Sequence, residues 1–236
     1  MDYLFRFPRP LHAATYLGRP HRFATTCRLA DGAVVQSHMA DPGRLREVLV
    51  EGAELLLDGP FGPPRKLAWS TVLARRDDAY LTLQSQMPNR LFPLLLAAGF
   101  FPSLTGDVRA EIKRGHSRYD FQVGETLVEV KGLTLHLGDG LGAFPDAPSA
   151  RARKHVRGLT EHVAEGGRAA VVFVGGLGVI ERVTMATDID PELADAILEA
   201  EAAGVEVLAA GVTWDRLGAR DPYAIEWVSP RRDRSS

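Results

Sequence analysis

Two acidic side chains and one lysine stand at a spacing that suits metal-dependent phosphodiester chemistry. Asp120 lies in the segment 117–121, and Glu129 and Lys131 follow in the segment 127–131. Two carboxylates held close together repel each other unless a cation lies between them, and hard oxygen donors of this kind suit Mg²⁺ or Mn²⁺. A bound metal ion polarises a phosphoryl oxygen, and a neighbouring ammonium stabilises an attacking hydroxide or the developing negative charge.

A β-hairpin is predicted to bring these three groups together. Residues 119–123 and 126–131 are rich in aromatic and β-branched side chains, and a short glycine-containing turn separates them. Because side chains alternate along a strand, Glu129 and Lys131 are expected on one face. Asp120 lies on the partner strand, at the end far from the turn, where it can approach Glu129.

Glu129 and Lys131 have a second interpretation, because a glutamate two residues before a lysine occurs often by chance. In that interpretation they form a solvated pair on an edge strand, and Asp120 is an acid beside a turn. The rest of the strand 127–131 is apolar. This setting favours a position inside a sheet, where charges need partners or a metal ion.

The composition is that of an ordinary globular protein. The chain has 236 residues, of which 45% are hydrophobic and 25% charged, and a net charge of −2 that argues weakly against a nucleic-acid partner. Cys27 is the only cysteine, and the N-terminal residues lack the apolar core of a signal peptide, so a cytoplasmic location is expected. The longest apolar run, 91–101, is too short to cross a bilayer and is expected to be a buried helix. The protein is therefore not expected to bind a membrane.

Residues 1–86 are predicted to form a five-stranded barrel of the OB type. Turn signals separate five strand-like runs, which are 23–29, 33–38, 53–57, 67–75 and 79–84. Short strands packed this densely fit a Greek-key barrel that commonly binds oligonucleotides. One helical insertion is expected at 42–50, with Asp41 as its N-cap.

Residues 87–229 are predicted to form a mixed α/β unit, and residues 230–236 a flexible tail. The expected helices are 90–98, 149–164 and 191–203. The expected strands are 108–114, 119–123, 126–132, 169–174 and 205–209. A polar loop is expected at 136–148. The predicted fold class is therefore α/β (α+β), with the barrel first.

Several short motifs follow one another in order along the chain. They are Arg19-Pro20-His21-Arg22-Phe23, His38-Met39-Ala40-Asp41-Pro42-Gly43-Arg44-Leu45, Pro64-Arg65-Lys66, Pro88-Asn89, Ser117-Arg118-Tyr119-Asp120-Phe121, Glu129-Val130-Lys131, Phe144-Pro145-Asp146-Ala147, and Arg151 with Lys154-His155. Together they resemble the sugar fermentation stimulation protein A (SfsA) family over nearly the whole chain. Two positions depart from the family pattern, since Asp41 replaces a usual Asn and Ala152 a usual Gly.

The resemblance implies an OB fold followed by a unit like the PD-(D/E)XK restriction endonucleases. It also implies binding of DNA with little sequence preference and a Mg²⁺-dependent phosphodiesterase site. Carried over to this chain, Asp120 and Glu129 would hold Mg²⁺ or Mn²⁺, and Lys131 would assist the nucleophile. Glu111 would add either a further carboxylate to the metal site or a hydrogen bond to one of the metal ligands.

Basic residues outside the hairpin are candidate phosphate contacts. They are Arg22, Arg44, Arg65, Lys66, Arg118, Arg151, Lys154 and His155. The run 151–157 has an alternative as a solvated helix face, and Arg118 as a partner of Asp120. Phe23 either stacks on a base or fills the core, and the core is favoured because an aromatic residue that begins a strand usually packs inward. His38 is expected as a structural hydrogen-bonder, and Asp146 lies in a loop that either closes over substrate or forms a rigid turn.

Two functions of different classes therefore stay open. One is a Mg²⁺-dependent nuclease that holds DNA, or RNA, on the barrel and cleaves it at Asp120, Glu129 and Lys131. The other is a non-catalytic DNA-binding regulator of sugar (maltose) metabolism genes that keeps the nuclease scaffold only for binding. The intact acid–acid–lysine set favours retained metal chemistry, because pure binding does not require three such charges on a buried strand.

Overall fold

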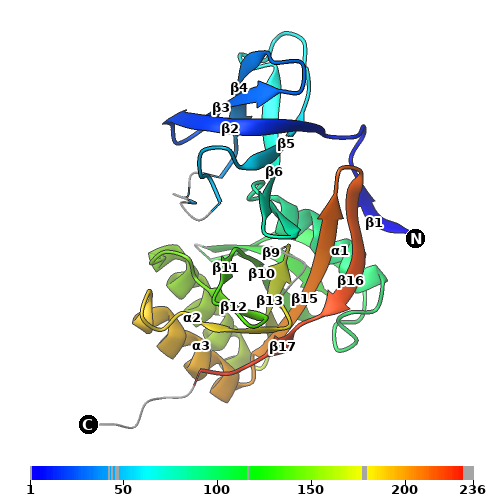
Figure 1. The fold of residues 1–236 in the computed structure, drawn as a ribbon. Helices are drawn as coiled ribbons and strands as arrows, with labels where there is room; N and C mark the ends of the chain where they lie inside the picture. The colour runs from blue at the N-terminus through cyan, green and yellow to red at the C-terminus, as the bar shows by residue number, and fades with distance from the viewer. Residues whose placement is uncertain are drawn as a thin grey trace. The chain divides into compact units, whose positions relative to one another are not determined.

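The chain divides into two compact units in the computed structural model, which describes residues 2–41, 43, 45, 48–115, 117–176 and 180–230 (Figure 1). The first unit comprises Met1–Met87, Gly176–Gly178 and Val212–Asp221, and the second comprises Pro88–Gly175, Val179–Gly211 and Pro222–Ser236. The candidate phosphate contact Arg44 and the tail residues 231–236 lie outside the described residues.

A closed five-stranded barrel forms most of the first unit. Its strands are β2 (His12–His21), β3 (Ala24–Leu29), β4 (Val34–Met39), β5 (Glu54–Asp58) and β6 (Trp69–Arg76). The strand order is β4-β3-β2-β5-β6, and a parallel pairing of β4 with β6 closes the ring. The prediction of an N-terminal OB-like barrel is confirmed.

The membership of the barrel differs from the prediction in one strand. The run expected at 79–84 forms β7 (Ala79–Thr82), which pairs only with β6 among the described strands and stands outside the ring. The barrel strand that the prediction lacked is β2. Its sequence includes Gly18 and Pro20, and its pairing with β3 has register shifts on both sides of Gly18. Such a strand lacks the regular alternation on which prediction depends. The unpredicted β1 (Tyr3–Arg6) pairs antiparallel with β16 (Gly218–Ala224).

Buried hydroxyl groups lie where the barrel closes. The side chain of Thr71 on β6 donates to Ser37 on β4 at 2.9 Å and is 2.8 Å from the hydroxyl of Thr25 on β3. All three residues are buried, so each hydroxyl needs a protein partner. Around them the core is aliphatic, with fully buried Leu55 and Leu73.

The helix expected at 42–50 falls in part on residues outside the described part of the chain. Among the described ones, the Oδ1 atom of Asp41 accepts a hydrogen bond from the N–H of Gly43 at 2.7 Å. The N–H groups of Val48 and Leu49 both donate to the carbonyl of Leu45. These contacts describe a local turn.

A mixed sheet and three helices form the frame of the second unit (Figure 1). The sheet strands, in spatial order, are β15 (Glu206–Asp215), β13 (Arg168–Gly175), β10 (Thr126–Leu133), β9 (Ser117–Val123) and β8 (Val108–Arg114). Strands β10, β13 and β15 are parallel, and β8 and β9 are antiparallel to their neighbours. The helices are α1 (Met87–Ala97), α2 (Ala150–Ala164) and α3 (Pro191–Ala203). The predicted α/β class is therefore confirmed.

Capping residues set the bounds of α2 and α3. The Ser149 hydroxyl accepts from the N–H of Ala152 at 3.1 Å, and the Asp190 carboxylate accepts from the N–H of Leu193 at 3.0 Å. At the other end of α3, Gly204 has φ of 101°, a left-handed conformation that favours glycine. These local signals explain why both helices could be located from the sequence.

The polar loop expected at 136–148 is wrong in part. It contains strand β12 (Leu141–Phe144) and one end of β11 (Leu135–His136), which form a second small sheet with β14 (Arg182–Met185) and β17 (Glu226–Trp227). These strands have only two or four residues, too few to show a periodic pattern. No helix among the described residues is long and apolar enough to span a membrane.

Candidate metal and nucleic-acid sites

Asp120 is fixed by the backbone and by helix α1. It and Glu129 occupy the next opposing positions after the last backbone pair of the β9–β10 ladder. Beyond that pair, a side chain replaces the backbone as the hydrogen-bond acceptor: the Oδ2 atom of Asp120 accepts from the N–H of Val130 at 2.8 Å. Its Oδ1 atom accepts from the side-chain amide of Asn89 at 2.7 Å.

Glu129 is a buried charge with one oxygen fully occupied. Its Oε1 atom is 2.6 Å from the Nζ atom of Lys131 and 2.6 Å from the Nδ1 atom of His155. Its Oε2 atom is buried and has no hydrogen-bond partner among the described residues. The expected shared face of Glu129 and Lys131 is confirmed, and the solvated-pair interpretation is wrong, because Glu129 is only 3% exposed.

The two carboxyl groups differ in protonation behaviour. Burial and the nearby charge of Glu129 raise the pKa of Asp120, although its hydrogen bonds from Val130 and Asn89 oppose the change. Burial also acts to raise the pKa of Glu129, but the hydrogen bond from His155 and the charge of Lys131 outweigh it, and that pKa is lowered. The two carboxyl groups thus interact unfavourably, and a cation between them would relieve this repulsion.

The donor set of this hairpin fits a hard divalent cation. The buried Oε2 atom of Glu129 lacks a partner among the described residues. Asp120 is close enough for the charge of Glu129 to raise its pKa. In the described part of the chain there is no group of three or more His, Cys, Asp and Glu side chains arranged to hold a metal ion. Mg²⁺ is commonly held by one or two carboxylates while water and substrate phosphates complete its coordination.

Glu111 lies elsewhere than the sequence predicted. Its side chain is 62% exposed and pairs with Arg118 at 3.1 Å on the surface of β8 and β9. The backbone explains this position, since Glu111 has φ of 58° and the β8–β9 register omits it between Ala110 and Ile112. Glu111 therefore joins Arg118 instead of Asp120 and Glu129. Arg118 in turn does not neutralise Asp120.

The expectation that His155 contacts phosphate does not agree with the structure, because the side chain is not accessible to solvent. It is 5% exposed, with Nδ1 bonded to Glu129 and its ring 5.4 Å from that of Tyr119. The neighbouring Lys154 and Arg151 are exposed. Sequence reasoning missed the contact because 26 residues separate His155 from Glu129, and no local pattern joins them.

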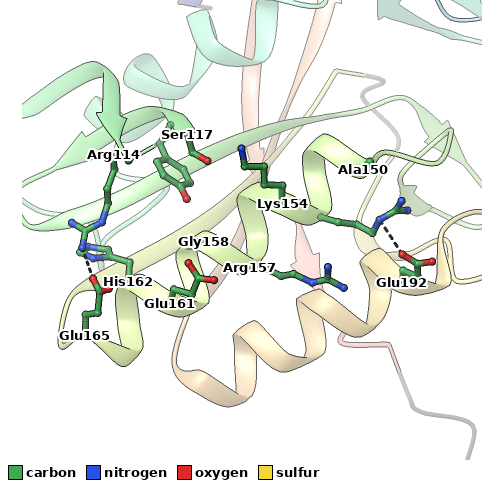
Figure 2. Close-up of a pocket in the computed structure, with 13 residues that line it drawn as sticks. Arg114, Ser117, Ala150, Lys154, Arg157, Gly158, Glu161, His162, Glu165 and Glu192 are labelled. Atoms are coloured by element: carbon green, nitrogen blue, oxygen red, sulfur yellow. Dashed lines mark hydrogen bonds and ion pairs between the residues drawn. The ribbon is translucent and has the colours of Figure 1, made fainter.

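Lys154 lines a cavity of about 860 Å³ bounded by α2, the β8–β9 hairpin and α3 (Figure 2). Charges of both signs surround this cavity. Arg114 pairs with Glu165 at 2.7 Å, and Arg153 pairs with Glu192 at 3.3 Å. We call Asp120, Glu129, Lys131 and His155 the buried carboxylate site, and none of these four residues lines the cavity.

A second pocket, of about 600 Å³, lies on the barrel in the first unit; we call it the barrel pocket. Its lining residues are His21, Phe23, Gln36, His38, Arg65, Lys66, Leu67 and Ser70. Phe23 is 39% exposed, so its expected place in the core is wrong. The guanidinium of Arg22 lies over the Phe23 ring at 4.8 Å, and that of Arg65 lies over the Phe61 ring at 3.8 Å. Three of the predicted barrel cations thus lie in or next to one pocket.

Two further candidates have simple surroundings. His38 is exposed and forms part of the wall of the barrel pocket. Asp146 is exposed, and its Oδ2 atom accepts a hydrogen bond from the hydroxyl of Thr134 at 3.1 Å. This contact joins the two ends of the segment that contains β11 and β12.

The fold and the site define a class of two-domain proteins. In this class a closed OB-type barrel is followed in the chain by a mixed α/β unit with a carboxylate-bearing hairpin. Residues 17–83 match the model of the SfsA N-terminal OB domain, and residues 86–218 match that of the sugar fermentation stimulation protein RE domain. The chain therefore belongs to the sugar fermentation stimulation protein (SfsA) family.

Relatives and a solved structure agree with this assignment. The chain is 40% identical over 216 residues to a sugar fermentation stimulation protein homolog of Moorella thermoacetica, covering 87% of this chain and 91% of that protein. A homolog from Enterococcus mundtii is 33% identical over 218 residues, with 88% of each chain covered. The structure of Pyrococcus furiosus SfsA in complex with Ca²⁺ superposes with a TM-score of 0.84 at 22% identity, covering 97% of this chain and all of that one, and so shows the same fold.

Proposed function

We propose that this protein binds nucleic acid, DNA above all, with little sequence preference, and that its second unit is a Mg²⁺- or Mn²⁺-dependent phosphodiesterase. The observation that carries the proposal is the buried Glu129, with one oxygen held by Lys131 and His155 and the other unpartnered among the described residues. A buried charge is costly, and an arrangement that keeps Glu129 ionised beside Lys131 and Asp120 is typical of a functional site.

Asp120 and Glu129 are the residues that would hold the metal ion. When bound, such an ion polarises a phosphoryl oxygen and lowers the pKa of a bound water. The solved Pyrococcus furiosus SfsA is a complex with Ca²⁺, which has the same preference for hard oxygen ligands. That precedent in a protein of the same fold supports a divalent-cation site here.

Lys131 is the residue that would act on the phosphoryl group. Its side chain is 17% exposed, so its ammonium bonds the buried Glu129 while part of the side chain remains accessible to a ligand. It would hold a proton at Nζ and stabilise the negative charge that develops on the phosphate. His155 is a positioning residue, because its bond to Oε1 fixes the orientation of Glu129.

Nucleic-acid binding would rest on exposed cations of both units. In the first unit these are Arg22, Arg65 and Lys66 around the barrel pocket, and in the second they are Arg151 and Lys154 on α2. Cations of this kind contact phosphate oxygens, which are the same in every sequence. Binding should therefore vary little with sequence and weaken steeply as salt rises.

The test is a cleavage assay on single- and double-stranded DNA and RNA with Mg²⁺ or Mn²⁺, comparing wild type with Lys131→Ala. We expect the substitution to lower the cleavage rate by roughly 100-fold or more, and to leave DNA binding in metal-free buffer within about twofold. Lys113→Ala, on the exposed strand β8, is the matched lysine control and should cleave like wild type.

Each outcome has a separate meaning. Cleavage that Lys131→Ala leaves unchanged would place the chemistry elsewhere. An absence of cleavage on every substrate, with DNA binding intact, would leave the second function, a non-catalytic DNA-binding regulator of sugar metabolism genes. An absence of binding at low salt would refute both.

A further inference from the structure

We propose that the barrel pocket binds unpaired nucleotides, so that this protein takes single-stranded nucleic acid in preference to duplex. The inference rests on the proposed nucleic-acid binding and adds the form of the ligand. Three features of the pocket carry it, which are its charge, its aromatic surfaces and its shape.

The charge of the barrel pocket selects an anion. None of its eight described lining residues is acidic, whereas Arg65 and Lys66 are cations. The polar partner of the Arg65 guanidinium there is the neutral hydroxyl of Ser70 at 3.3 Å. By contrast, the cavity beside α2 has glutamates paired with its arginines. Positive charge in the barrel pocket is therefore available to a phosphodiester.

The aromatic surfaces favour a flat, apolar partner beside that phosphate. Phe23 is 39% exposed on the pocket wall, and the guanidinium of Arg22 lies 4.8 Å from its ring centroid. Phe61 lies outside the lining, and its ring supports the guanidinium of the lining residue Arg65 at 3.8 Å. Aromatic rings and guanidinium planes next to phosphate-binding cations are the surfaces on which bases of single strands stack.

The shape of the site distinguishes unpaired from paired bases. In a duplex each base face is covered by its neighbours, and exposing it costs a few kcal/mol of stacking and pairing. A pocket of about 600 Å³ is large enough to take a nucleotide. A base can reach Phe23 in this recess only if it has left its stack, and a single strand supplies such a base at lower cost.

The polar rim explains why the pocket would accept more than one base. Gln36, His21, His38 and Ser70 supply side-chain donors and acceptors around the aromatic surface. Stacking itself tolerates any base, because every base has a flat face. Weak sequence preference and a strong preference for single strands are therefore compatible in one site.

The experiment measures the affinity of a labelled oligothymidylate of about 20 nucleotides and of a matched duplex, in EDTA to prevent cleavage and at low salt. Wild type should bind the single strand at least about tenfold more tightly than the duplex. Phe23→Ala should lose roughly 5- to 100-fold of single-strand affinity and leave duplex affinity within about twofold.

Two controls make the result specific. Val34→Ala replaces another exposed apolar residue of the same barrel, outside the pocket lining, and should bind like wild type. An abasic strand of equal length keeps the phosphates and lacks the bases. Wild type and Phe23→Ala should therefore bind it equally, and Phe23→Trp should keep the single-strand preference.

The outcomes separate this inference from the proposed function. Equal wild-type affinity for the two forms, or an equal loss on both forms in Phe23→Ala, would overturn the inference and leave nucleic-acid binding standing. A loss on the abasic strand as large as on the normal strand would also overturn it, because stacking would then not be involved. Failure to bind either form at low salt would refute the proposed function itself.

Discussion

The buried carboxylate site and the barrel pocket hold charge in opposite ways. In the first, Glu129 is 3% exposed and its charge is met by Lys131 and His155 of the same chain. In the second, Arg65 and Lys66 are exposed and no acid is among the described residues of the lining. Inside the protein, removal of one partner of a charge pair leaves a costly unpaired charge, whereas charges exposed to solvent are available to a ligand and contribute little to stability.

The largest expected effect on stability belongs to the buried side of this comparison. His155→Ala removes a partner of Glu129 and leaves a cavity against Tyr119, so the free energy of unfolding should fall by about 3 kcal/mol. Urea denaturation measures this change. Lys154→Ala, the adjacent exposed residue on α2, should change it by no more than about 0.5 kcal/mol. Similar losses in the two variants would mean that the buried contacts of His155 with Glu129 and Tyr119 are not the cause.

A buried carboxylate with a full set of partners sharpens the comparison further. Asp190 accepts from the N–H groups of Ser149 and Leu193 and pairs with Arg153 at 2.8 Å. Asp190→Ala should therefore cost about 1–2 kcal/mol as a lost helix cap with its ion pair. Asp190→Asn, which keeps a hydrogen-bond acceptor, should cost less.

The effect of Asp190 should also depend on pH. Burial acts to raise its pKa, but the hydrogen bonds from Ser149, Arg153 and Leu193 outweigh it, and the pKa is lowered. Its stabilisation is therefore complete above the unfolded-state pKa of about 3.9 and is lost as the pH falls through the lower folded-state value. Urea curves of wild type and Asp190→Ala should converge at acid pH. A difference that stays constant would show that the ionised carboxylate is not the cause.

Asp120 should show the opposite sign, because its charge is unfavourable in the metal-free protein. Burial and Glu129 disfavour its ionised form. An Asn side chain removes the charge repulsion and can still accept the hydrogen bond from Val130, and a flipped Asn89 amide can accept one from the new NH2 group. We expect Asp120→Asn to raise the free energy of unfolding in metal-free buffer by about 0.5–1 kcal/mol and to abolish cleavage. A destabilised variant would mean that the repulsion is not significant.

The smallest stability effects are expected in the barrel pocket. Arg65→Ala and Lys66→Ala should each alter the free energy of unfolding by less than about 0.5 kcal/mol. Each should instead reduce the slope of log affinity against log salt for a single strand by about 0.7, as one phosphate contact is lost. Lys113→Ala, a lysine of the second unit, is the control for charge alone. An unchanged slope in both pocket variants would remove them from the phosphate contacts.

Elements with strong local signals could be predicted from the sequence. Helix α3 and strand β8 have the bounds predicted for them, because caps, a terminal glycine and β-branched residues act within a few positions. Strand β2 could not be found, since its pairing with β3 in the barrel is irregular around Gly18. The short strands β12 and β14 depend on distant pairings, since they pair in parallel with each other, β12 also pairs with β11, and β14 also pairs with β17.

The same division between local and distant causes applies to the candidate sites. The alternation of one strand placed Glu129 beside Lys131, and the hairpin placed Asp120 opposite them. The position of His155 depends on the packing of a helix, and that of Glu111 on a left-handed backbone angle. Neither cause leaves a pattern in the neighbouring residues, so both residues were misplaced by sequence reasoning.

Closure of the barrel by β4 and β6 ties occupancy of its pocket to folding. Gln36 and His38 belong to β4, whereas Arg65 precedes β6 and Ser70 lies within it. These two segments lie side by side only when the ring is closed. A molecule that binds to both segments therefore binds only the folded barrel and stabilises it. By mass action, the melting temperature of the protein should rise with the concentration of that molecule.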